Sequence, residues 1–117
     1  MRIVRAENEP RRENPHGVEV KKLYDTENAQ VVHITLKPGE SLMKHVTPVD
    51  VFFYVLEGEG KVEIGDEVRA VRRDDLIDSP KGIAHRLMND GTSDFRFLVA
   101  KLPRPTEKSK FATPKAE

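Results

Sequence analysis

Polar and apolar residues alternate along most of this chain with a period of two, which places every second side chain on one face of a β-strand. Val32, Ile34 and Leu36, for example, share one face of a predicted strand. His33 falls between them and is therefore expected on the opposite face, toward solvent or a subunit interface. The same alternation, or a short run of β-branched and aromatic residues, predicts strands over residues 18–24, 30–36, 51–56, 61–64, 67–71, 76–79, 84–88 and 95–102.

Turn-forming residues separate these segments, and no segment shows the repeat of an amphipathic helix of about three turns. Gly65-Asp66 joins two of the strands as a hairpin, and Asp25 to Asn28 are expected to form the turn after the first strand. Many short strands at spacings of about 8–12 residues are typical of a β-sandwich or barrel. A chain of 117 residues is long enough for one such domain. The pattern therefore predicts a single all-β domain.

The two ends of the chain differ in character from the middle. Residues 1–16 and 104–117 are polar, contain several prolines and have few apolar residues that could anchor them. We therefore expect an N-terminal arm over 1–16, the β-domain over 17–103 and a loose C-terminal tail over 104–117. From Lys101 onward the basic residues outnumber the acidic ones, and we interpret this excess as a solvated tail.

Composition narrows the class of function. Twenty basic residues balance twenty acidic ones, so the chain lacks the positive field that would attract nucleic acid. Cysteine is absent, which excludes disulfides and thiolate metal sites and is consistent with a reducing compartment. The longest apolar run, Val51 to Leu56, is too short to cross a bilayer. We therefore expect a soluble, cytoplasmic protein that binds neither nucleic acid nor a membrane.

Two short motifs carry most of the candidate chemistry. The first runs from Pro38-Gly39 through His45 to Gly58, and the second is Pro80-x-Gly82-x-x-His85-x-x-x-Asn89. Together they resemble the two conserved motifs of the cupin superfamily. The resemblance implies a double-stranded β-helix, or jelly roll, over residues 17–103, in which His45 and His85 converge on one pocket.

The resemblance also implies a partner, because cupins are commonly dimers that share edge strands. An open jelly roll leaves strand edges that need cover. The apolar positions of the first strand, Val18, Val20 and Leu23, are the candidates to supply it from a second subunit. We therefore expect a homodimer.

The first motif departs from the family pattern at two metal-binding positions. Where the family carries a second His and a Glu, this chain has Thr47 and Val51. Two histidines alone make a weak metal site, because stable sites usually supply three or four donors. Asp50 is the nearest carboxylate, but on a regular strand it points away from the face of Val51, and only a β-bulge would turn it inward. Otherwise it is a solvated or loop-capping carboxylate.

The resemblance and the two-residue parity together define a candidate pocket at the barrel mouth, lined by Met43, His45, Thr47, Val51, Phe53, His85 and Leu87. A mostly apolar lining with a few convergent polar groups is typical of small-molecule sites. Its candidate metal donors are His45, His85 and Asp50, for a divalent transition metal such as Fe, Zn, Ni, Cu or Mn. His16 and His33 are not expected to be catalytic.

These residues leave two functions open. The first is a small-molecule-binding protein with a reduced or weak divalent-metal site. The alternative, implied by the resemblance, is a metal-dependent enzyme of the dioxygenase, isomerase or decarboxylase type. The fold alone does not separate a binding module from an enzyme, because it hosts many activities.

Overall fold

The computed structural model describes residues 1–107, 110 and 111. Within these residues, no helix combines the length and the hydrophobicity that crossing a membrane requires. The described elements are one 3₁₀ turn and ten strands: η1 (Ala6–Asn8), β1 (Glu19–Thr26), β2 (Ala29–Leu36), β3 (His45–Val46), β4 (Asp50–Glu57), β5 (Glu59–Ile64), β6 (Glu67–Arg72), β7 (Leu76–Ser79), β8 (His85–Met88), β9 (Phe95–Leu102) and β10 (Lys110–Phe111).

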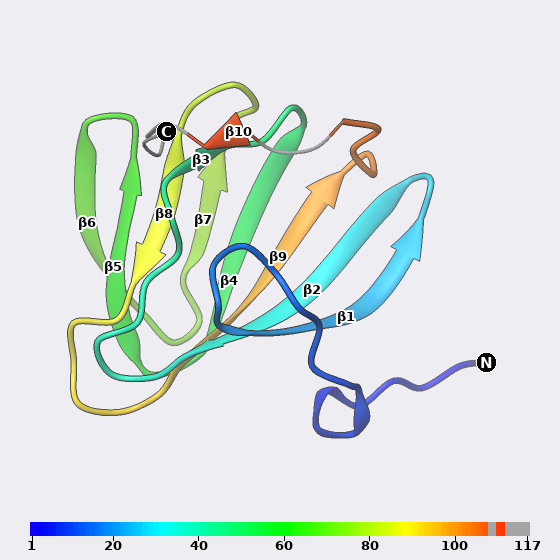
Figure 1. Ribbon diagram of the computed structural model, residues 1–117, viewed down its shortest axis with the longest axis horizontal. Helices are drawn as coiled ribbons and strands as arrows, with labels where there is room; N and C mark the ends of the chain where they lie inside the picture. The colour runs from blue at the N-terminus through cyan, green and yellow to red at the C-terminus, as the bar shows by residue number, and fades with distance from the viewer. Residues whose placement is uncertain (108–109, 112–117) are drawn as a thin grey trace.

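The strands form two five-stranded sheets, with the order β1-β2-β9-β4-β7 in one and β10-β3-β8-β5-β6 in the other. All the pairs are antiparallel. From β3 onward the chain alternates between the sheets, except at the β5–β6 hairpin. Figure 1 shows β1 and β6 at opposite outer edges of the molecule. This topology confirms the predicted all-β double-stranded β-helix.

The strand bounds follow the sequence pattern closely. Strands β7 and β9 begin and end where the pattern predicts. The other predicted strands differ from the prediction by one or two residues at one or both ends. The turn expected from Asp25 to Asn28 is shorter, because the β1–β2 ladder continues to the pair Thr26 and Ala29. The short strands β3 and β10 have too few residues to show a periodic pattern and were not predicted.

The core lies between the two sheets, on the faces that the alternation predicts. In β4 and most of β9, every second side chain is buried, whereas in β2 the four consecutive residues 33–36 are all buried. Phe53, Phe95 and Phe97 are the largest buried side chains. The rings of Phe53 and Phe97 meet edge to face at 6.3 Å between centroids. Gly58, which ends the first motif, has a φ of 84°, and a Cβ there would collide with the backbone carbonyl of Asp94.

One prediction on the outer face needs correction. His33 lies on the face of β2 that points away from Ile34 and Leu36, as predicted, but it is buried there, at 5% exposure, rather than exposed to solvent. Arg96, on the neighbouring strand β9, covers it and donates from Nη1 to His33 Nε2 at 2.9 Å. Burial and the Arg96 charge both lower the pKa of His33, so the ring is neutral.

The N-terminal arm packs against the sheet. The backbone N–H of Arg12 donates to the carbonyl of Val20 at 2.8 Å, so the arm covers part of the outer edge of β1. Val18 is buried in the chain's own core, and Val20 packs against that core. These two side chains are therefore not available to cover a second subunit, and the homodimer itself stays a prediction.

Candidate functional site

A cavity of about 480 Å³ lies between the two sheets, on the side where the N-terminal arm crosses them. We call it the inter-sheet cavity. Its lining comes from the arm, from both sheets and from the segment after β9: Asn14, Pro15, His16, Val20, Val32, Ile34, Leu42, His45, Thr47, Phe53, His85, Val99, Lys101, Pro105 and Glu107. Four of the seven pocket residues predicted from the sequence are among them, namely His45, Thr47, Phe53 and His85.

The two motif histidines meet in this cavity. His45 on β3 and His85 on β8 are direct partners across the antiparallel ladder. Their ring centroids lie 4.7 Å apart, with the rings nearly perpendicular. Both side chains are buried, at 8% and 2% exposure.

His85 is held from both sides by hydroxyl groups. Ser79 Oγ lies 2.6 Å from its Nδ1, and Thr47 Oγ1 lies 3.2 Å from its Nε2. A hydroxyl can donate or accept, so this pair satisfies both nitrogens of a neutral imidazole. His85 is therefore both a wall of the cavity and a hydrogen-bonded part of the core.

The backbone of Met43 orients two other histidines. Its N–H donates to Nδ1 of His16 at 2.8 Å, and its carbonyl accepts from Nδ1 of His45, also at 2.8 Å. In the neutral rings, Nε2 of His16 therefore carries the proton and Nε2 of His45 carries the lone pair. The His16 and His45 rings lie 5.1 Å apart. The Met43 backbone thus makes Nε2 of His16 a hydrogen-bond donor and Nε2 of the neighbouring His45 ring a hydrogen-bond acceptor.

His16 was not among the residues predicted to line the pocket, but it lines the cavity. It comes from the arm, where no strand pattern or motif points to a position in space. Its contact with Met43, far along the chain, helps to hold it at the cavity. No sequence signal that we know of would have identified it.

The electrostatics of the cavity keep its histidines neutral. Burial is the main cause in each case: it lowers the pKa of His85 to about 3 and that of His16 to about 4, and it also lowers the pKa of His45. The nearby Lys101 ammonium adds to the effect on all three rings. At neutral pH the cavity therefore presents uncharged imidazoles beside one lysine.

These shifts predict a loss of stability in mild acid. The unfolded chain takes up protons on His16 and His85 below a pKa of about 6.5, whereas the folded chain takes them up only near 4 and 3. The unfolded state then binds more protons, so the free energy of unfolding should fall by about 2 kcal/mol between pH 7 and 5.5. Urea unfolding at several pH values measures this. His16→Gln should reduce the slope, because the other buried histidines still contribute, and a flat profile in both proteins would contradict the assignment.

The other predicted pocket residues lie elsewhere. Val51 and Leu87 are buried in the core and do not line the cavity, at 2% and 0% exposure. The Met43 side chain is 40% exposed, and only its backbone serves the site. Asp50 is exposed, and its carboxylate accepts the backbone N–H of Lys81 at 3.0 Å. It is therefore a loop-capping carboxylate rather than a cavity residue.

The residues present do not fit a metal ion. In the part of the chain that the structure describes, no three His, Cys, Asp or Glu side chains are arranged to hold one. Thr47 is engaged with His85, and the position of the family's Glu is an apolar side chain in the core. Lys101 also brings a positive charge to the same cavity, which disfavours a dication.

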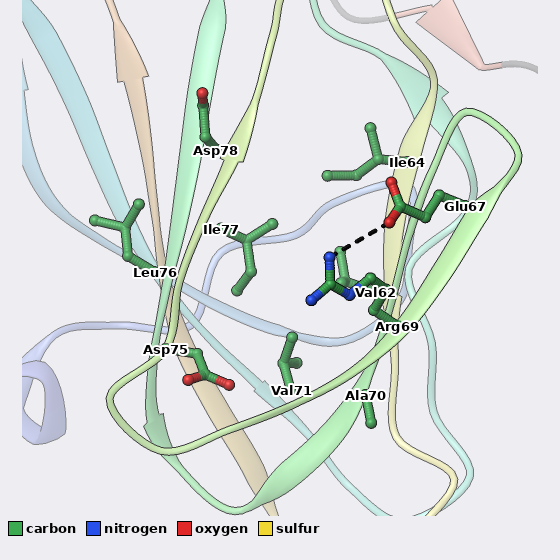
Figure 2. Close-up of a pocket in the computed structure, with 10 residues that line it drawn as sticks. All are labelled: Val62, Ile64, Glu67, Arg69, Ala70, Val71, Asp75, Leu76, Ile77 and Asp78. Carbon is green, nitrogen blue, oxygen red and sulfur yellow. Dashed lines mark hydrogen bonds and ion pairs between the residues drawn. The ribbon is translucent and has the colours of Figure 1, made fainter.

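A second cavity, of about 400 Å³, lies between the β5–β6 hairpin and β7. Figure 2 shows its lining, with the ion pair of Glu67 and Arg69 at 3.4 Å. Both members of this pair are largely exposed, and none of the motif histidines reaches this cavity. Because it lacks buried convergent polar groups, we take the inter-sheet cavity as the candidate site.

Comparison with known proteins agrees with the motifs. Residues 32–101 match the profile described as the Cupin domain. The tetracenomycin polyketide synthase protein TcmJ of Streptomyces glaucescens is 40% identical over 78 residues, which cover 62% of this chain and 52% of that protein. The chain thus spans about half the length of this relative.

Solved structures share the fold over nearly the whole chain. A conserved protein of Klebsiella pneumoniae with a double-stranded β-helix domain has a TM-score of 0.82 at 23% identity, covering 97% of this chain and 98% of that one. The polyketide cyclase RemF of Streptomyces resistomycificus has a TM-score of 0.84 at 20% identity, covering 97% of this chain and 86% of that one. At these identities the likeness concerns the fold alone.

Proposed function

Since the chain belongs to the Cupin domain family, we propose that it binds a small, mostly apolar molecule in the inter-sheet cavity. The observation that carries this proposal is the lining itself. Apolar side chains such as Ile34, Phe53 and Val99 surround a few polar groups that converge from different elements. Shape and apolar contact would supply most of the affinity, and the polar groups would orient the ligand.

The polar groups offer complementary hydrogen bonds. In the neutral tautomers, Nε2 of His45 is a hydrogen-bond acceptor and Nε2 of His16 is a hydrogen-bond donor. A ligand that bears oxygen atoms suits a cavity lined by such neutral rings. The name of the relative TcmJ places that protein with a polyketide synthase. An aromatic, oxygen-bearing molecule of polyketide type is therefore the first ligand class to try.

The proposed binding does not depend on a metal. The donor set seen in the described residues does not fit one, so neither the weak metal site nor the metal-dependent enzyme has support from the geometry. The neutral imidazoles serve as hydrogen-bonding groups instead.

Filling the cavity tests the proposal. Val32 lines it, so Val32→Trp should weaken binding of the neutral probe 2-naphthamide at least about tenfold, since the indole would occupy the ligand's space. Val68→Trp is the matched control, because Val68 is 54% exposed on β6 and lies outside the cavity. Fluorescence titration or calorimetry measures the affinity. Equal binding by both variants, or no binding by the parent chain, would contradict the proposal.

A further inference from the structure

Lys101 is a charged residue on the inner face of β9. Alternate residues of this strand point between the sheets: Phe95, Phe97 and Val99 are buried there, and Lys101 continues the same face into the cavity. The side chain is half-buried. The ammonium group of Lys101 takes part in none of the ion pairs or hydrogen bonds found among the described residues. Glu107 also lines the cavity, but it is exposed and forms no ion pair with the lysine.

The strand register explains why no carboxylate faces this lysine from the neighbouring strands of its sheet. Lys101 lies directly opposite Val51 on β4 and opposite Gln30 on β2. Val51 stands where the family motif carries its Glu. Opposed residues of an antiparallel pair have Cβ atoms about 5 Å apart, so a carboxylate at position 51 would reach the ammonium group. With valine there, the neighbour on that side is apolar.

An ammonium group in apolar surroundings is costly unless an anion accompanies it. Burial accordingly lowers the pKa of Lys101. Among the described residues, the titratable groups that share the cavity with it are the neutral rings of His16, His45 and His85 and the exposed carboxylate of Glu107, which forms no ion pair with it. An anionic group on a bound ligand would supply the missing partner.

We propose that Lys101 is the anion-recognising residue of the inter-sheet cavity, and that the ligand is an apolar molecule bearing a carboxylate or a comparable anionic oxygen. This inference rests on the proposed function and narrows its ligand class. The apolar body of the ligand packs against Val20, Ile34, Phe53 and Val99, and its anionic oxygen pairs with the Lys101 ammonium. The lysine thus provides the positive charge that a metal would provide in a site with the full family motif.

Two probes of the same shape separate charge from apolar contact. The parent chain should bind 2-naphthoate at least about tenfold more tightly than neutral 2-naphthamide, because a hydrogen bond to a charged group contributes roughly 1.5–3 kcal/mol, or about 10- to 100-fold. Lys101→Met should remove that preference while changing the 2-naphthamide affinity by less than about twofold. Lys37→Met is the control, because it removes an exposed lysine outside the cavity and changes the net charge equally.

The outcomes distinguish the role proposed for Lys101 from the proposed function of the cavity. Equal binding of both probes by the parent chain, or an equal loss of both in Lys101→Met, would overturn the role of Lys101 and leave the proposed function standing. Failure of the parent to bind either probe would overturn both. If Lys101→Met does not fold, Lys101→Gln makes the same comparison. Val51→Glu gives an independent check, because an internal carboxylate should abolish the preference for 2-naphthoate with Lys101 still in place.

Discussion

Replacing His85 with alanine should lower the free energy of unfolding by about 3 kcal/mol, whereas His45→Ala should lower it by about 1 kcal/mol. His85 is 2% exposed, and its ring packs edge-on against Phe53 at 5.2 Å. Its removal would leave a cavity and would take a hydrogen-bond partner from each of the buried hydroxyls of Ser79 and Thr47, which are 0% and 1% exposed. The cavity and the two lost hydrogen bonds together account for the cost.

His45 is less deeply buried than His85, at 8% against 2% exposure. One hydrogen bond, to the Met43 carbonyl, holds its Nδ1, and the ring forms part of the wall of an existing cavity. Urea unfolding of the two variants measures the difference, with Val68→Ala as an exposed control. The two motif histidines look equivalent in the sequence. Equal losses in both variants would mean that the hydroxyl pair around His85 contributes little to stability.

The fold could be predicted because its signals are local and repeated. The alternation in β2, β4 and β9 assigns each side chain to a face. Residues assigned to the inner face, such as Val32 and Val99, do pack in the core or against it. The motif glycines and prolines then select one β-architecture among several. The short strand β3 shows the limit, since two residues carry no period and only the ladder between His45 and His85 defines it.

The site was harder to predict, for two physical reasons. Parity gives the face of a strand but not the position along it, so Val51 and Leu87 were placed in the pocket although they lie in the core. Distant contacts leave no local trace, which is why His16 was missed. Lys101 was different, because its sequence position puts it on the same face of the strand as Phe97 and Val99, which predicts an inward side chain. It was instead counted with the basic residues of the C-terminal tail, so this prediction was not made.

Rebuilding the family's donor set should create a metal site only when Lys101 is also removed. The variant Thr47→His with Val51→Glu adds a second imidazole beside His85 and a carboxylate opposite Lys101. That carboxylate should pair with the ammonium group rather than with a metal, so the melting temperature of the double variant should respond weakly to Zn²⁺ or Ni²⁺. Adding Lys101→Met leaves the carboxylate available as a donor.

The triple variant should therefore show the largest response to metal. A ligand that binds only the native state stabilises it by about 4 kcal/mol at a concentration of 1,000 times its Kd, which corresponds to roughly 10 °C or more in a domain of this size. Melting curves with and without each ion measure the shift, and Lys37→Met in the double-variant background controls for net charge. A double variant that responds as strongly as the triple one would show that Lys101 does not engage position 51. A strong response in the parent chain would instead mean that the present residues already hold a metal, and the metal-free binding proposed for the cavity would be wrong.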